Sequence, residues 1–398
     1  MSFQANDVQN IELNDSIPES KLYLRIHSID FLKGFSLCII ILTHIADAWI
    51  IQDSRCFYAA LYVFLDPFGV SLFIIMHSIT VIFWWKKKMG INPDKSIRNE
   101  ILSRAFFLFG LGILFNIFSL KEAPFPLNLW GWNVFMFIGL SYIICYYSIR
   151  LSRGARWIIG FLIFYITTPI REFLVNYREN NDTIAFIHFI VVSPNPEVTF
   201  LPYAALCFFS TIFGERILES MLLESKKAYL DTFRALITFG IIFLSISIFY
   251  GYGFVDDKIL DPSDYPQIEV IPILQNNGFN IIRIPGFLIR GTAPNLFFGL
   301  GIALLSLGIS FYLLDIEKFQ NYFIKILCVY GNFSLTLYLI HYIGILIFYR
   351  QLSIAVFIIL FFIYIIILGF LIFLWHKFFH GIGSLEWMLT KIAFKKKK

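Results

Sequence analysis

The sequence predicts an all-α fold, a polytopic bundle of about ten transmembrane helices with both termini in the cytoplasm. Three observations support this prediction. Only 15% of the 398 residues are charged and 58% are hydrophobic, whereas about 25% of the residues in ordinary soluble proteins are charged. The apolar residues fall in blocks of roughly twenty, which is the length that a helix needs to cross the hydrocarbon with its backbone bonded internally. The basic residues, finally, alternate between the two sides of the predicted membrane.

The first half of the chain contains five apolar blocks separated by short polar stretches. Tryptophans lie at several predicted helix ends, among them Trp84 and Trp130, where aromatic side chains form a belt at the membrane interface. The five predicted helices are residues 35–52, 57–85, 105–120, 129–149 and 157–170.

The second half contains five more apolar blocks, of which the first is the least well defined. Two connections, residues 171–197 and 253–290, are long enough to form substantial outer segments. The other outer connections are tight turns. The five predicted helices are residues 200–213, 235–252, 291–313, 326–349 and 352–376.

The chain is expected to form one membrane domain, residues 29–380, between a polar N-terminal tail, residues 1–28, and a basic C-terminal tail, residues 381–398. The first twenty residues are polar and acidic, without the pattern of a signal peptide. The five cysteines are scattered and show no CxxC spacing. Neither structural disulfides nor a metal site is therefore expected.

The formal charge of +5 follows the predicted topology. With the N-terminus inside, the cytoplasmic segments hold 24 Lys and Arg residues and the outer segments hold 8. This asymmetry favours a cytoplasmic location for both termini. It also explains the charge better than nucleic-acid binding does, so no nucleic-acid partner is expected.

Polar residues inside the predicted helices are the main functional candidates, because a charged side chain at the bilayer centre costs about 2.5 to 3.5 kcal/mol. His44 lies in the outer half of the first helix, and Asp47 follows at i+3 on the same face. The carboxylate is therefore expected to orient the imidazole, which would act as a general base. The alternative is a histidine that hydrogen-bonds between helices.

Two other histidines lie within predicted helices. His341 is expected at an outer depth similar to that of His44, with Tyr338 on its face at i−3. Substrate contact and interhelical hydrogen bonding are both open for His341. His77 is expected in the inner half, where it either packs against polar neighbours or lines a path from the cytoplasm.

Charged residues near the membrane surfaces form the second group of candidates. Asp30 is too far along the helix to reach His44, at about 21 Å, and is expected to pair with Lys33 at i+3. A basic cytoplasmic stretch would contact anionic lipid or the phosphates of coenzyme A. On the outer side, two arginines are expected either to belong to a solvated loop or to bind an anionic group. These residues are Lys86, Arg98 and Arg104 inside, and Arg283 and Arg290 outside.

The spacing of Asp30, Lys33, Gly34 and His44 resembles the opening of the membrane-bound acyltransferase superfamily, which includes acyltransferase family three and the heparan-α-glucosaminide N-acetyltransferase-like proteins. Lys33 stands where those proteins have arginine. Four further segments are similar to later helices of the family. They are FGVSLFIIMHSIT, ILSRAFFLFGLGILFN, FIGLSYII and GNFSLTLYLIHYIG.

The resemblance implies a cell-membrane enzyme that transfers an acyl group, expected to be acetyl, from cytoplasmic acyl-CoA to an extracytoplasmic glycan or glycolipid. His44 would be the base, while His341 or Tyr338 would stabilise the oxyanion. The donor's pantetheine would pass His77. Two rival interpretations remain open: a transporter or flippase for an amphiphile such as a lipid-linked sugar, and a membrane sensor without catalytic activity.

Overall fold

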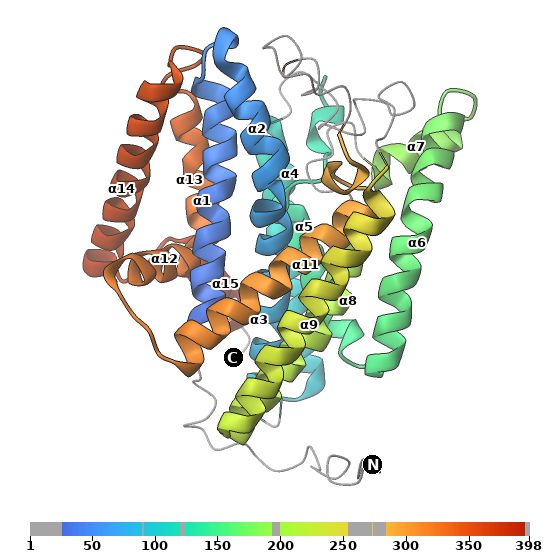
Figure 1. Ribbon diagram of the computed structural model, residues 1–398, viewed down its shortest axis with the longest axis vertical. Coiled ribbons are helices and arrows are strands. Elements are labelled where there is room, and N and C mark those ends of the chain that lie inside the picture. Colours follow the sequence, from blue (N-terminus) through green and yellow to red (C-terminus); the bar gives the residue numbers. More distant parts are fainter. Residues whose placement is uncertain are drawn as a thin grey trace.

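A computed structural model describes residues 26–89, 91–119, 124–192, 200–253, 273 and 284–394. The regular elements of these residues are helices, which confirms the predicted all-α class. Most of them run along one long axis, and the chain passes up and down the bundle in alternating directions (Figure 1). The start of α1 (His27–Trp49) and the last helix, α15 (Leu385–Phe394), lie at the same end. We call it the α15 end, and the opposite end the pocket end.

The helices follow the apolar blocks of the sequence, with polar residues at their ends. After α1, their bounds are α2 (Arg55–Asp66), α3 (Leu72–Lys88), α4 (Asp94–Ser119), α5 (Val134–Ser148), α6 (Arg153–Tyr177), α7 (Asp182–Val191), α8 (Phe200–Leu223), α9 (Lys226–Gly251), α11 (Ala293–Ser310), α12 (Tyr322–Asn332), α13 (Ser334–Ile345), α14 (Ile354–Phe379) and α15. Two π-helical turns continue α2 into α3 and extend α11. They are η3 (Pro67–Ser71) and η7 (Phe311–Ile316).

Within the described residues, seven helical stretches are long and apolar enough to cross a membrane, or eight if α12 and α13 count together as one span. The protein is therefore a multi-pass membrane protein. The predicted count of ten is not confirmed. Of the remaining predicted spans, α5 has only 15 residues, and α8 carries Glu215 and Glu219 in its second half.

The predicted helix at residues 326–349 is broken, because α12 and α13 meet at an angle of 91°. At the break, the backbone of Phe333 leaves the helical region, with φ −111° and ψ 28°. As a result α12 lies across the α15 end of the bundle, while α13 rises beside α1 (Figure 1). Two other helices were not predicted: α7 lies in the expected outer segment 171–197, and α15 lies in the expected C-terminal tail.

Two glycines allow α12 to cross α1 at very short range. A Cβ atom on Gly34 would lie 2.0 Å from the carbonyl oxygen of Leu327, and one on Gly331 would lie 1.8 Å from that of Asp30. No larger residue fits either position without moving a backbone. The glycine that follows Lys33 therefore has a packing role, which fixes α12 and the start of α13 against α1.

At the pocket end, the segment after α13 is held to the end of α1 by backbone hydrogen bonds. The N–H of Arg350 donates to the carbonyl oxygen of Ala48 at 2.8 Å, and that of Leu352 donates to Trp49 at 2.8 Å. The indole of Trp49 in turn donates to the carbonyl oxygen of Gly344 at 2.9 Å. These bonds fix α1 and α13 side by side, with Arg350 above the end of α1.

Candidate functional site

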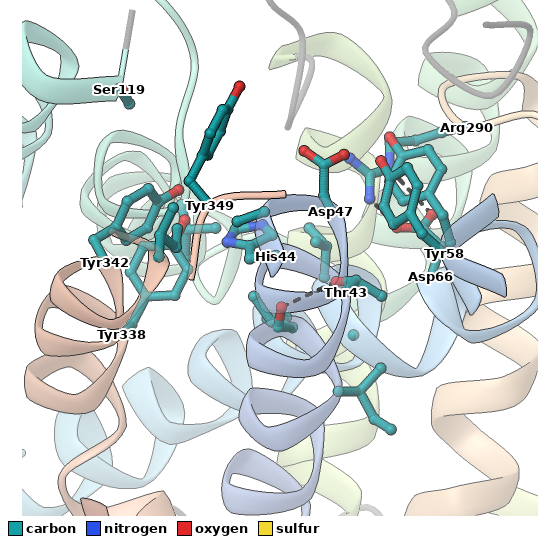
Figure 2. Close-up of a pocket in the computed structure, with 18 of the residues that line it drawn as sticks. Thr43, His44, Asp47, Tyr58, Asp66, Ser119, Arg290, Tyr338, Tyr342 and Tyr349 are labelled. Atoms are coloured by element: carbon teal, nitrogen blue, oxygen red, sulfur yellow. Dashed lines mark hydrogen bonds and ion pairs between the residues drawn. The ribbon is translucent and has the colours of Figure 1, made fainter. Parts of the chain in front are cut away.

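A cavity of about 490 Å³ opens between α1, α2, α13 and the segment before α11. It lies toward the pocket end of the bundle, and Figure 2 shows the side chains that line it. The lining is mostly aromatic and charged, which distinguishes it from the apolar core below. The residues with polar side chains are Thr43, His44, Asp47, Tyr58, Tyr62, Asp66, Ser119, Arg290, Tyr338, Tyr342, Tyr349 and Arg350.

His44 and His341 form a hydrogen-bonded pair at this cavity. Nδ1 of His44 lies 3.1 Å from Nε2 of His341. His341 is fully buried, whereas His44 is half-buried and lines the cavity. With Nδ1 engaged, the ring nitrogen of His44 that is left for a ligand is Nε2. The structure thus brings together two histidines that the sequence had placed at similar depth on different helices.

Tyrosines of α13 surround the histidine pair. The ring of Tyr342 lies 4.5 Å from that of His341 and 5.6 Å from that of His44, between centroids. The ring of Tyr338 lies 5.2 Å from that of His341. Both tyrosines line the cavity and point toward His44 in Figure 2. Phenol rings of α13 therefore lie beside the histidine pair in the wall of the cavity.

Asp47 does not serve as the predicted partner of His44. Its carboxylate forms an ion pair with Arg55 and lies 3.6 Å from the guanidinium of Arg350. The reason is geometric, because the backbone bonds after α13 carry Arg350 to the end of α1, where it competes for the carboxylate. Among the described residues, the hydrogen-bond partner of the His44 ring is His341.

A buried ion pair forms another wall of the cavity. The guanidinium of Arg290 makes two contacts with the carboxylate of Asp66, one of them between Nε and Oδ2 at 3.1 Å. The side chains of both residues are more than nine-tenths buried. Tyr62 lies beneath the same guanidinium, 5.3 Å from its ring centroid to the central carbon. The pair ties the end of α2 to the segment before α11.

A second group of polar side chains lies deeper in the bundle. Nε2 of His77 lies 3.3 Å from Oγ of Ser334, which is the first residue of α13. Lys33 of α1 is close enough to interact electrostatically with both His77 and Glu386. We call Lys33, His77, Ser334 and Glu386 the inner cluster. It lies on the α15 side of the histidine pair, where the sequence had placed His77.

Glu386 of α15 closes the inner cluster. Its Oε1 accepts hydrogen bonds from the backbone N–H groups of Leu335 at 2.8 Å and Thr336 at 3.3 Å, and its Oε2 accepts one from the Thr336 hydroxyl at 2.5 Å. Burial raises the pKa of this carboxyl above its ordinary value, although the three hydrogen bonds act in the opposite direction.

The predicted basic patch is divided among different neighbours. Lys86 is half-buried and interacts electrostatically with Glu215 and Glu219. Arg104 is buried, 3.2 Å from Glu100 and over the ring of Trp84. Arg98 is exposed. The three cations therefore do not form one uninterrupted surface for an anion.

Two predicted site residues remain, Asp30 and Arg283. Asp30 is half-buried near the start of α1, one turn from Lys33, and interacts with it electrostatically. Arg283 lies outside the described residues. In the part of the chain that the structure describes, no three His, Cys, Asp or Glu side chains gather as a metal site would require.

Three residues that matter most to these sites were not identified from the sequence. Asp66 is a carboxylate inside a predicted transmembrane helix, so the rule that singled out His44 would have found it. Arg350 and Glu386 gave no such signal, because Arg350 lies in an expected connection and Glu386 in the expected C-terminal tail.

No protein-family model matches this chain, and no curated protein is similar to it.

Proposed function

We propose that the protein is an acyltransferase of the membrane-bound superfamily that its first helix resembles, taking acetyl-CoA as donor and a hydroxyl or amine of a glycan or glycolipid as acceptor. One observation carries the proposal. His44, on α1, lines a polar cavity, and its Nδ1 is held by the buried His341, which leaves Nε2 without a protein partner among the described residues. An imidazole oriented in this way is the arrangement that general-base catalysis requires.

The reaction would run in two stages at His44. Nε2 of His44 takes the proton of the acceptor hydroxyl as its oxygen attacks the thioester carbonyl, and the tetrahedral intermediate forms. The bond between carbon and sulfur then breaks, and the imidazolium returns the proton to the departing thiolate. His341 positions the ring, while the hydroxyl of Tyr338 or Tyr342, which lie beside the histidine pair, would stabilise the oxyanion.

The two ends of the bundle would serve different substrates. The charge distribution favours a cytoplasmic α15 end, so acyl-CoA would enter there, past the exposed Arg98 and the inner cluster. The acceptor would enter the cavity at the pocket end. Its tyrosines and ion pairs supply the flat apolar faces and polar groups that bind sugars.

The broken helix favours one alternative, a transporter for an anionic amphiphile. Discontinuous helices that begin near the membrane centre are typical of transporter binding sites, and α13 begins after a 91° bend beside His77. In that case the histidines would couple protons or bind cargo, and no acyl group would move.

The test is an acyl-transfer assay with the purified protein in detergent, radiolabelled acetyl-CoA and a surface-glycan extract. We expect wild-type protein to label the extract and His44→Ala to lose activity at least about a hundredfold, as the removal of a general base does. His376→Ala is the matched control, because His376 is an exposed histidine at the far end of α14. If the wild-type protein moves no acyl group to any acceptor, the transporter interpretation replaces this one.

A further inference from the structure

The N-terminus of α13 lies inside the bundle and carries no local cap. Phe333, at the cap position, forms no side-chain hydrogen bond to the first turn. The N–H groups of Leu335 and Thr336, which belong to the first turn of α13, donate hydrogen bonds to the carboxylate of Glu386 instead. This residue belongs to a helix about 50 residues further along the chain. A helix N-terminus attracts anions, because its N–H groups and its dipole favour negative charge. Here an anion of the protein itself fills that place.

Lys33 supplies a second, independent indication of an anion site. Its side chain is more than nine-tenths buried. Among the described residues, its ammonium has no hydrogen bond and no ion pair within 4.0 Å, although Glu386 and Asp30 interact with it at longer range. A buried cation without a close partner is costly. An anion placed between Lys33 and α13 would neutralise it.

The helix that carries Glu386 contacts the bundle along one side. Of residues 385–392, Leu385 and Leu389 bury apolar side chains, while Met388 and Lys391 are exposed. It joins α14 through a turn with glycines at positions 381 and 383, both with positive φ. Moving this helix would expose two leucines and break its hydrogen bonds to the start of α13, while the other helices keep their contacts with one another.

We infer that the N-terminus of α13 and Lys33 form a binding site for a phosphate group, and that Glu386 of α15 occupies this site until the ligand displaces it. Two backbone N–H groups, a threonine hydroxyl and a lysine ammonium are the donors that helix N-termini offer to phosphate. The inference goes beyond the proposed function, since it requires binding and displacement but no acyl transfer. If the protein is an acyltransferase, the phosphate would belong to the donor that enters from the α15 end.

The first experiment measures binding of inorganic pyrophosphate to the full-length protein in detergent by calorimetry. Glu386→Ala removes the competing carboxylate, so we expect it to bind pyrophosphate at least about tenfold more tightly than wild type, the effect of one charge-assisted hydrogen bond. Glu386→Gln, which keeps the shape of the side chain, should gain part of this increase. The double variant Lys33→Met with Glu386→Ala should lose it.

Glu219→Gln is the matched control, since it removes a carboxylate at the same end that pairs with Arg153 on the surface. We expect it to bind pyrophosphate as wild type does. The inference is overturned if Glu386→Ala and Glu386→Gln bind no better than wild type, or if Lys33→Met does not reduce the gain. Acyl transfer by wild type in the separate assay would then still support the proposed function.

The second experiment follows α15 in the wild-type protein by hydrogen exchange. Saturating pyrophosphate should increase amide exchange in residues 385–394, because the helix leaves its position. A merely structural cap would show unchanged or slower exchange, which would contradict the inference. Nanodiscs of phosphatidylcholine with or without phosphatidate distinguish the source of the phosphate. Faster exchange with phosphatidate alone would identify a lipid, and faster exchange only with pyrophosphate a soluble ligand.

Discussion

The cavity at the pocket end and the inner cluster are both polar sites inside an apolar bundle, but they differ in access. The cavity is open, and its charged residues are already joined in ion pairs, Asp47 with Arg55 and Asp66 with Arg290. The inner cluster is closed by Glu386, and within the described part of the chain its lysine has no ion pair closer than 4.0 Å. A ligand can therefore bind in the cavity with little rearrangement, whereas a ligand of the inner cluster must first move a helix.

The largest effect is expected at the wall of the open cavity. Arg290→Ala leaves the carboxylate of Asp66 buried and without its guanidinium, which should cost about 3–5 kcal/mol of stability. The measurement is the thermal unfolding midpoint in detergent. Arg234→Ala, which breaks an exposed pair with Asp231, should leave the midpoint nearly unchanged. Equal midpoints for the two variants would show that the Asp66 pair does not support the cavity.

The next effect tests how the inner cluster is assembled. Gly34→Ala places a Cβ atom against the carbonyl oxygen of Leu327, so α1 and α12 must separate at a cost of about 1–3 kcal/mol. Gly110→Ala is the control, because a Cβ atom there meets nothing within 4 Å. It should be neutral or stabilise α4 slightly. A thermal midpoint for Gly34→Ala at or above that of wild type would contradict the close crossing.

A smaller effect is expected from His341, which positions His44 without lining the cavity. His341→Gln should lower kcat for acyl transfer about tenfold and leave KM for acetyl-CoA unchanged, because only the orientation of the base is affected. His376→Gln should change neither constant. A rise in KM with unchanged kcat would show instead that His341 contributes to substrate binding.

The smallest effect is a pH dependence of stability at Glu386. Its pKa is raised in the folded protein, so the folded state holds this proton to higher pH than the unfolded state does. Stability should therefore fall as pH rises from the ordinary glutamate range through the folded-state pKa. Unfolding midpoints measured over this range should fall less in Glu386→Gln than in wild type. Parallel curves for the two proteins would exclude the carboxyl as the source.

The sequence predicted the fold class because the length and composition of apolar blocks are local properties. The break at Phe333 was not predicted in this way, since Asn332 and Ser334 beside it are too few to interrupt the apolar block that contains them. Its causes are distant in the chain: the crossing of Gly331 over α1, and the carboxylate of Glu386 at the start of α13. Helix α15 was missed because its ten residues are too few for a membrane span and directly precede the basic run Lys395–Lys398.

The sequence predicted how deep in the membrane the candidate site residues lie, but it did not predict their contacts. Charge asymmetry placed His44 and His341 at one level, yet only the packing of α1 beside α13 shows that they share a hydrogen bond. The i+3 spacing favoured Asp47 as the partner of His44. That expectation failed because Arg55 forms an ion pair with this carboxylate and Arg350, brought close by a loop, lies near it as well.

The most direct test of the account uses sealed proteoliposomes with radiolabelled acetyl-CoA inside and the glycan acceptor outside. Protein oriented with the α15 end inward should transfer label to the outer acceptor, and His44→Ala should lose this transfer while His376→Ala keeps it. Transfer that occurs only when donor and acceptor share one compartment, or that survives in His44→Ala, would contradict a reaction served from both ends of the bundle.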